Sequence, residues 1–169
     1  ALYLCPNQQL VEQTQEQAKK FGIPFVNLEA DSSLPGDFLQ GDAILIVVAQ
    51  KLFTGRTKFG TGTQSLEVGA IVLDDSHACI DIIRDAFTIK LPRVHALWEQ
   101  LFTLFQAELA KQGLGRVAEI RGGIATTFLP VPYWTWQEQL ATVSDLLVKY
   151  GTDQEIRFAW PLLRDVLLD

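Results

Sequence analysis

The sequence predicts an α/β fold built on a parallel sheet, followed by a mostly helical C-terminal segment. Short apolar runs alternate with helical or loop segments, which is the rhythm of parallel α/β sheets; these runs are residues 1–5, 24–28, 43–49 and 69–74. The run AILIVVA is apolar throughout and rich in β-branched residues, as expected for a strand covered on both faces. Beyond residue 113 the pattern becomes helical and aromatic, which marks a second part of the chain.

Composition and charge narrow the class of protein. With 169 residues, 48% hydrophobic and 20% charged, the chain has the composition of a globular domain. A net charge of −6 does not favour non-specific nucleic-acid binding, although a local basic patch can still bind. Cys5 and Cys79 lack disulfide-framework or zinc-site spacing, so a cytoplasmic location is expected. No apolar run reaches roughly 18 residues, and no secretory leader is recognisable, so no membrane partner is expected.

The first half of the chain alternates strands with helices and loops. ALYLC is a strand that Pro6 ends, and Asn7 is a good N-cap for a helix that Gly22 stops. Residues 31–42 predict an acidic loop, and residues 50–65 predict a short helical turn followed by a glycine-rich loop.

The middle of the chain changes from strands to helices. A helix at 77–86 follows the strand at 69–74, and FTIKL at 87–91 is interpreted as another strand. Pro92 suits the first turn of a long helix whose apolar stripe ends near Gly113.

The last third of the chain is predicted to be mostly helical. An irregular aromatic stretch covers 122–136, and Pro161 is expected to kink or split the second of two further helices, at 136–150 and 153–168. The change of composition divides the chain into a sheet-bearing part and a helical insertion or accessory segment, at 1–113 and 114–169.

Two adjacent carboxylates close the strand at 69–74. In parallel α/β sheets ligands bind at the carboxyl ends of strands, and Asp74 and Asp75 stand at such an end. Carboxylates there can hold hydrated Mg²⁺ together with a bound phosphate, and a neighbouring carboxylate can position an attacking water. The alternative is structural, because Asp75 and Ser76 can cap the helix that starts near His77.

Three segments carry a resemblance to a known family. IVLDDSHA resembles the DEAD/DEAH-box motif of superfamily-two helicases. LYLCPNQQLVEQTQEQAKKFGI resembles the strand–Pro–helix motif that follows the Walker A helix in that family, with Pro6, Leu10 and Gln13 matching its usual residues. DAILIVVAQKLF resembles the strand and turn that precede the DEAD/DEAH strand. The three segments stand in the expected order and cover roughly residues 1–90.

The resemblance implies an incomplete first RecA-like domain of the P-loop NTPase type, with three α/β/α layers, which uses ATP and Mg²⁺. Asp74 matches the acid that holds Mg²⁺ through water, and His77 matches the final residue of the DEAH form, which couples nucleotide state to the other motifs. Asp75 stands where the family usually has the glutamate that orients the hydrolytic water. Its shorter side chain puts turnover in doubt.

The resemblance also implies contact with DNA or RNA. Pro6, Asn7 and Gln8 match the turn that touches the nucleic-acid backbone, whereas Ala49 replaces a frequent Thr and loses one phosphate contact.

A basic loop adds a second prediction of nucleic-acid binding, this one from the residues themselves. Lys51, Arg56 and Lys58 alternate with Phe53 and Phe59, and such a mixture suits single strands, with charge on phosphates and rings under bases. The alternative is a solvated loop whose two phenylalanines fold into the core.

Two family motifs are missing. GRTKFGTG at 55–62 lacks the Lys and Ser/Thr of a phosphate-binding loop, so it is rejected as one. The Ser-Ala-Thr motif is absent as well, and GIATTFLP at 123–130 is only superficially similar. A second RecA-like domain of the same parent chain, with its arginine finger, does not fit in 169 residues. The chain is therefore expected to be a fragment of a helicase that is inactive alone.

Two other functions remain open. A metal-dependent hydrolase could use Asp75 with His77, Asp81 and Asp85, which recur every four residues on one helix face, although such a stripe is more often solvated. A non-catalytic interaction domain could keep the helicase-like fold without its chemistry, which the residues at positions 49 and 75 favour.

Overall fold

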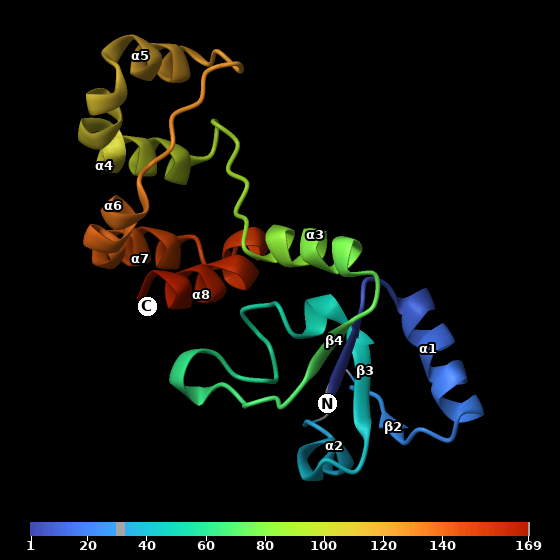
Figure 1. The fold of residues 1–169 in the computed structure, drawn as a ribbon. Coiled ribbons are helices and arrows are strands. Elements are labelled where there is room, and N and C mark those ends of the chain that lie inside the picture. The colour runs from blue at the N-terminus through green and yellow to red at the C-terminus, as the bar shows by residue number, and fades with distance from the viewer. Residues whose placement is uncertain (30–32, 169) are drawn as a thin grey trace. The chain divides into compact units, whose positions relative to one another are not determined.

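The computed structural model describes residues 1–29 and 33–168. The chain forms two compact units, whose elements are coloured along the chain in Figure 1. The first unit comprises Ala1–Thr88 with Phe158–Leu162, and the second comprises Ile89–Arg157 with the residues from Leu163 on. The units therefore divide after Thr88 rather than after residue 113, because the long helix that follows packs with the other C-terminal helices.

The first unit contains a parallel sheet of four strands among the described residues. The strands are β1 (Leu2–Cys5), β2 (Phe25–Val26), β3 (Ile44–Val48) and β4 (Ile71–Leu73), in the spatial order β2-β3-β1-β4. All three neighbouring pairs are parallel. The predicted α/β class with a parallel sheet is confirmed.

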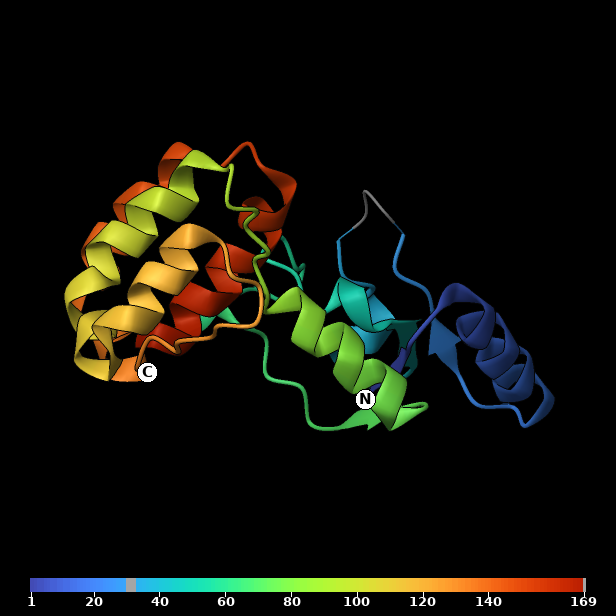
Figure 2. The ribbon, with the colours of Figure 1, turned by 90° about the horizontal axis from the view of Figure 1, so that it is seen from above.

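Helices cover both faces of this sheet. On one face, Cys5 and Ile46 pack against Val11 and Ala18 of α1 (Gln8–Lys20). On the other face, the core joins alternate strand residues to α2 (Gly36–Gln40), the 50–65 loop and α3 (Ser76–Ala86); it consists of Leu2, Leu4, Phe38, Leu45, Val47, Ala49, Phe59 and Cys79. Figure 2 shows α1 and α3 on opposite sides of the strands.

The predicted helix boundaries at the start of the chain are confirmed. Asn7 caps α1, with its side-chain oxygen accepting the N–H of Leu10 at 2.9 Å, and Gly22 follows the helix with a positive φ of 67°. The short helix α2 was not predicted, and it lies within the predicted loop at 31–42, of which residues 31 and 32 are outside the described residues.

The strand at 69–74 was predicted to be buried, and this prediction is wrong. β4 is a three-residue edge strand that pairs only with β1. Its Ile71 and Val72 point to opposite faces, yet they are 49% and 47% exposed. The edge strand β4 and the central strands contain the same kinds of apolar residues, so the sequence did not indicate that β4 is exposed.

The second unit contains helices from α4 onward. Their bounds are Ala96–Gln112 for α4, Leu114–Gly122 for α5, Tyr133–Glu138 for α6, Leu140–Lys149 for α7 and Gln154–Leu168 for α8, whose residues 158–162 belong to the first unit. No helix in the described part of the chain is both long and apolar enough to cross a membrane.

Four predictions for this region differ, in whole or in part, from the structure. Residues 87–91 form no strand, and α4 begins after Pro92, at Ala96, because the ring nitrogen Nδ1 of His95 accepts the N–H of Leu97 and caps the helix. The aromatic stretch becomes helical already at Tyr133. Finally, α8 continues through Pro161, so of the two predicted effects of this proline the split does not occur.

Candidate functional site at the carboxyl edge of the sheet

The parallel sheet brings four chain segments to one edge. Pro6 follows β1, Asn27 follows β2, Ala49 follows β3 and Asp74 follows β4. Because the strands are parallel, their carboxyl ends lie at the same edge, which is where open α/β sheets bind ligands.

Hydrogen bonds join the ends of β1 and β4 directly. The backbone N–H of Asp74 donates to the Leu4 carbonyl at 2.8 Å, and Leu4 is in register with Leu73. The Cys79 thiol of α3 lies against the same two segments, 3.1 Å from the Asp74 carbonyl and 3.7 Å from that of Leu4. The Pro6–Gln8 turn and the acidic pair are therefore neighbours, although they are far apart in the sequence.

Asp75 begins α3 in an unusual backbone conformation. Its φ of 48° and ψ of 74° are left-handed, and it is the only non-glycine residue with a positive φ in the described ranges. Its Oδ1 accepts the N–H of Ala78 at 3.3 Å, so Asp75 is the N-cap of α3 and Ser76 is its first residue. The cap interpretation is confirmed for Asp75, whose carboxylate remains exposed at the surface.

The predicted metal stripe on α3 is not assembled into a site. His77 and Asp85 are exposed, and Asp81 binds Arg84 at 2.8 Å on the surface. In the part of the chain that the structure describes, no three His, Cys, Asp or Glu side chains come together as they would around a metal ion. The metal-dependent hydrolase therefore receives no support.

The carboxylates fit one part of a Mg²⁺–phosphate site. Asp74 is half-buried at the carboxyl edge, next to the exposed Asp75, and Mg²⁺ bound with a nucleotide needs only one or two carboxylates beside water and phosphate oxygens. The phosphate-binding loop is not provided by 55–62, because that segment runs between the short 3-10 turns at Ala49–Lys51 and Gly62–Gln64 rather than from a strand into an α-helix.

The two buried thiols do not contribute a nucleophile. Burial raises the pKa of Cys5 and of Cys79 above the usual thiol value, and the negative charge of Asp74 adds to this rise in the pKa of both. Both side chains therefore stay protonated at neutral pH, and the Cys79 thiol acts as a hydrogen-bond donor between β1 and α3.

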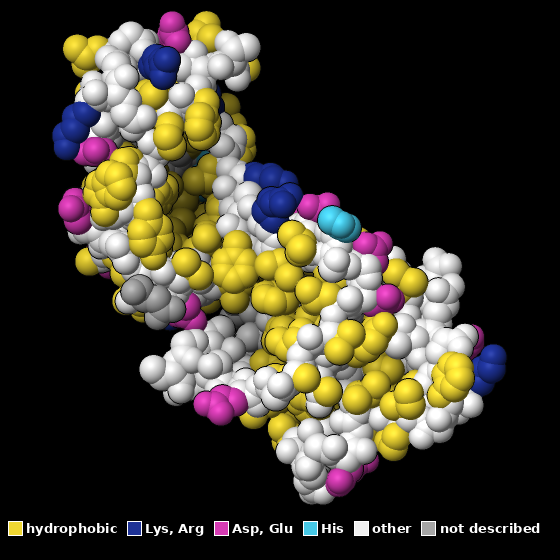
Figure 3. All heavy atoms as spheres, in the orientation of Figure 1, with side chains coloured by type: hydrophobic (Ala, Val, Ile, Leu, Met, Phe, Trp, Pro, Cys, Tyr) yellow, Lys and Arg dark blue, Asp and Glu magenta, His cyan; other side chains and the backbone are white. Residues whose placement is uncertain are grey.

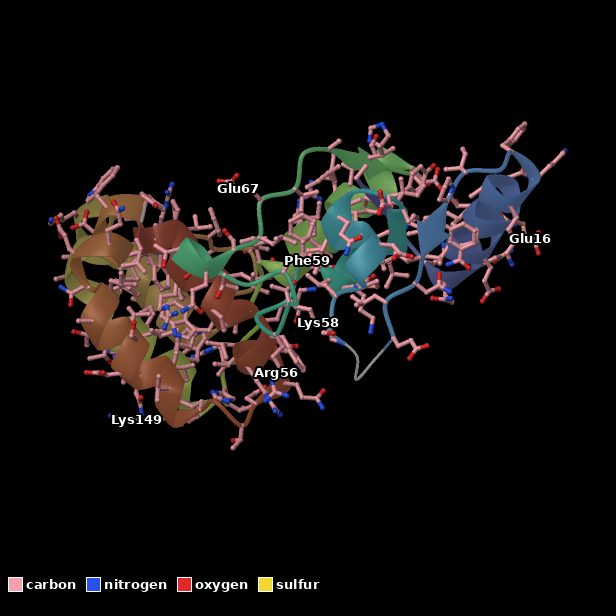
Figure 4. The ribbon with its side chains drawn as sticks, turned by 90° about the horizontal axis from the view of Figure 1, so that it is seen from below. Glu16, Arg56, Lys58, Phe59, Glu67 and Lys149 are labelled. Atoms are coloured by element: carbon pink, nitrogen blue, oxygen red, sulfur yellow. The ribbon has the colours of Figure 1, made fainter. Side chains whose placement is uncertain are left out.

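The basic loop is held in place by its own contacts. The Lys58 ammonium donates to the Glu29 carbonyl at 2.8 Å, and the Thr57 hydroxyl donates to the Lys51 carbonyl at 3.1 Å. Phe59 is only 3% exposed and packs edge-on against Phe38, so its ring belongs to the core, as the alternative interpretation expected. Figure 4 shows Arg56, Lys58 and Phe59 along this loop.

Two adjoining pockets lie along the carboxyl edge. One, of about 150 Å³, is lined by Gln8, Gln15 and Asn27 together with apolar residues of β3 and Lys51. The other, of about 340 Å³, is lined by the predicted basic residues Lys51, Arg56 and Lys58, with Gln50, Thr54 and three apolar side chains. Both pockets share Leu28, Val48 and Lys51, so they form one groove of amides and cations, which we call the edge groove.

The structure places the predicted site residues in two groups. Gln8 and the three basic residues line the edge groove, whereas Asp74, Asp75 and His77 cluster at the start of α3 and line neither pocket. Pro6 is buried at the turn, and Asn7 is used as the cap of α1.

Gln15 and Asn27 were missed by the sequence analysis. The Gln15 amide donates to the Asn27 side chain at 2.7 Å inside the edge groove. A signal was present for Gln15, because its spacing of seven residues from Gln8 puts both amides on one helix face. Asn27 carried no signal, because only the parallel pairing of β2 with β3 brings it to this edge.

Comparison with known proteins adds no family. No family model, no curated protein and no solved structure matches the chain.

Proposed function

We propose that this chain is part of the first RecA-like domain of a superfamily-two DEAD/DEAH-type helicase. The longer protein binds ATP and Mg²⁺, moves along DNA or RNA in the cytoplasm, and contains a phosphate-binding loop and a second RecA-like domain. The chain contributes a nucleic-acid-binding groove and the acidic pair.

The observation that carries the proposal is the pairing of β1 with β4. The resemblance to helicases assigns the Pro6–Gln8 turn to the nucleic-acid backbone and the Asp74–Asp75 pair to ATP hydrolysis within one domain. The hydrogen bond from Asp74 to the Leu4 carbonyl supports this, because it brings both segments to the carboxyl edge of adjacent strands.

The roles of the acids follow from their position. Asp74 would hold the hydrated Mg²⁺, which neutralises charge on the phosphates of bound ATP. Asp75 would orient the attacking water through the carboxylate oxygen that does not cap α3. A left-handed non-glycine residue is strained, and such strain gathers at functional sites, which favours a chemical role for Asp75 in addition to its cap.

The open edge of β4 supports a larger sheet. Parallel sheets are normally covered on both faces, yet Ile71 and Val72 are half exposed on opposite faces. Figure 3 shows hydrophobic side chains over the region where β4 lies in Figure 1. Further strands beside β4, with the helices that connect them packed on both faces, would cover these residues, as expected for a larger sheet.

Binding of single-stranded nucleic acid tests the proposal with the chain as it stands. Lys51, Arg56 and Lys58 should give a log–log salt slope of about −2 for oligothymidylate, from roughly −0.7 per phosphate contact. Replacing all three by Ala should weaken binding and flatten the slope towards zero in a fluorescence anisotropy titration.

A matched control variant separates local binding from the loss of charge. Lys20, Arg116 and Lys149 are exposed and line neither pocket of the edge groove, so replacing them by Ala removes the same charge. Equal affinities and slopes for the two triple variants would contradict a binding site in the edge groove.

The second candidate is a non-catalytic nucleic-acid or protein interaction domain with a helicase-like fold. The cap made by Asp75 favours it, because this hydrogen bond accounts for the residue without chemistry. As a nucleic-acid-binding domain it predicts the same binding, and as a protein interaction domain it predicts none. In both cases Asp75 makes no contribution to ATP hydrolysis in the longer protein.

A further inference from the structure

An apolar pocket adjoins the edge groove. It measures about 350 Å³ and is lined by Gln50, Phe53, Thr54, Ile82, Asp85, Ala86 and Phe158, all of which belong to the first unit. Gln50, Thr54 and Phe158 also line the basic pocket. The two pockets are thus neighbours with different chemistry, one cationic and the other mainly apolar.

Two aromatic rings give this pocket its character. Phe158 is 40% exposed, although it is a large apolar side chain. Phe53 lines the same pocket and is tilted against Phe87, with 6.4 Å between the ring centroids. Ile82 and Ala86 of α3 complete an apolar wall. A volume of about 350 Å³ lies at the lower end of the roughly 300–1,000 Å³ of small-molecule sites.

The position of Phe158 is fixed relative to the basic loop. The backbone N–H of Gly55 donates to the Phe158 carbonyl at 2.7 Å. A Cβ at Gly55 would lie 2.6 Å from the Pro161 ring, so the backbone of the loop packs directly on this segment of α8. The segment that carries Phe158 is therefore held against the basic loop, and Phe158 lines one pocket together with Arg56 and Lys58.

We propose that this pocket binds an unpaired base of a single-stranded nucleic acid whose phosphates lie along the edge groove. The inference rests on the nucleic-acid-binding part of the proposed function. It assigns Phe158 as a base-stacking residue, a role that the helicase resemblance does not give to any residue of α8.

The charge and the aromatic rings of the two pockets favour a nucleotide unit as the ligand. A nucleotide unit has an anionic phosphate and a flat apolar base face, and the adjoining pockets offer three cations and two aromatic rings in the same arrangement. A purely apolar ligand would make no use of the cationic pocket, and a simple anion would make no use of the aromatic pocket.

The test compares a normal single strand with one that lacks bases. A fluorescein-labelled oligothymidylate and the same sugar–phosphate strand with abasic sites are titrated with the chain and with Phe158→Leu and Phe158→Tyr. Leu keeps an apolar side chain on the helix and removes the ring, whereas Tyr keeps a stacking surface. Phe128→Leu is the control, because Phe128 is an exposed phenylalanine that lines none of these pockets.

We expect Phe158→Leu to weaken binding of the normal strand about tenfold, the loss of one stacked base. Its salt slope and its affinity for the abasic strand stay unchanged, because no phosphate contact is lost. Phe158→Tyr and Phe128→Leu keep the parental affinity for both strands. A strand with 2-aminopurine in place of one base adds a direct readout, since its fluorescence falls on stacking with the chain but less with Phe158→Leu.

Other outcomes overturn the inference in distinguishable ways. If the parental chain binds both strands equally, the edge groove binds phosphates and the base pocket is refuted, while the proposed function stands. The base pocket is likewise refuted if Phe158→Leu weakens binding of both strands by the same factor. If neither strand binds, both the pocket and the nucleic-acid part of the proposed function fail.

Discussion

At the scale of single residues, Asp75 combines two features that no sequence pattern reveals together. Its side chain caps α3, and its backbone is left-handed. The cap follows from the residue type, because Asp is a preferred N-cap, but the positive φ follows from the tight turn between β4 and α3. The Asp75 carboxylate can therefore have a catalytic role, a capping role or both, and substitutions can separate the two.

Replacing Asp75 with Ala should lower the free energy of unfolding more than replacing it with Gly or Asn. Ala loses the cap and should lower the free energy of unfolding by about 1 kcal/mol. Gly loses the same bond, but it adopts φ of 48° without the side-chain penalty, so it should equal or exceed Asp. Asn keeps both the oxygen acceptor and the tolerance of left-handed geometry. Urea denaturation measures the order, and an Ala variant as stable as the parent would show that the bond to Ala78 contributes nothing.

At the scale of elements, the sequence predicts which helices and strands exist better than it predicts how each is packed against its neighbours. The apolar runs locate β1 to β4, and Asn7 and Gly22 bound α1. The exposure of β4 depends on neighbours distant in the chain, so local patterns do not determine it. The start of α4 at Ala96 follows from a local cap, the bond from Leu97 to His95, which the helical pattern around Pro92 did not reveal.

A pair of core substitutions tests the edge position of β4. Leu45 in β3 is fully buried, whereas Ile71 in β4 is half exposed. Leu45→Ala should lower the free energy of unfolding by about 2–5 kcal/mol. Ile71→Ala should cost roughly half as much or less, because less apolar surface is buried. Equal losses in chemical denaturation would mean that β4 is covered in solution.

A pair of glycine substitutions tests the packing of the basic loop. Gly22 and Gly60 both have positive φ, but a Cβ at Gly22 meets open space whereas one at Gly60 meets the Gln64 carbonyl. Gly22→Ala should cost about 1–2 kcal/mol for left-handed geometry alone. Gly60→Ala should cost about 2–5 kcal/mol, since the clash is added. Thermal and urea unfolding compare them, and an equal cost would show that the loop moves aside freely.

The sequence predicted those residues of the candidate site that are close together in the chain. It did not predict those that only folding brings to the site. Pro6–Gln8 and Asp74–His77 are short motifs, and the three basic residues fall within one loop, so the sequence shows them. Asn27 and Phe158 come from other segments, which only the sheet and the contact of Gly55 with α8 bring to the site. No local pattern marks such residues.

At the scale of the whole molecule, the chain contains the edge groove, which we propose binds nucleic acid, and an acidic pair, but the described residues provide no phosphate-binding loop. Such a loop and its lysine make most contacts to a bound nucleotide. We therefore expect the 169-residue chain alone to show no Mg²⁺-dependent ATP hydrolysis in a phosphate-release assay. Activity that disappears in Asp74→Ala would contradict this and require a different nucleotide site.

The most direct measurement of the central claim is the rate of nucleic-acid-dependent ATP hydrolysis by the longer protein with Asp75→Asn. Asn preserves the cap of α3 and tolerates the left-handed backbone, so the fold should stay intact while the carboxylate is lost. The account predicts that hydrolysis falls at least about a hundredfold, the low end for losing a general base, while ATP still binds. Asp74→Asn, as the matched control, should weaken Mg²⁺–ATP binding itself. Hydrolysis at the parental rate in Asp75→Asn would contradict the account and leave Asp75 as a helix cap alone.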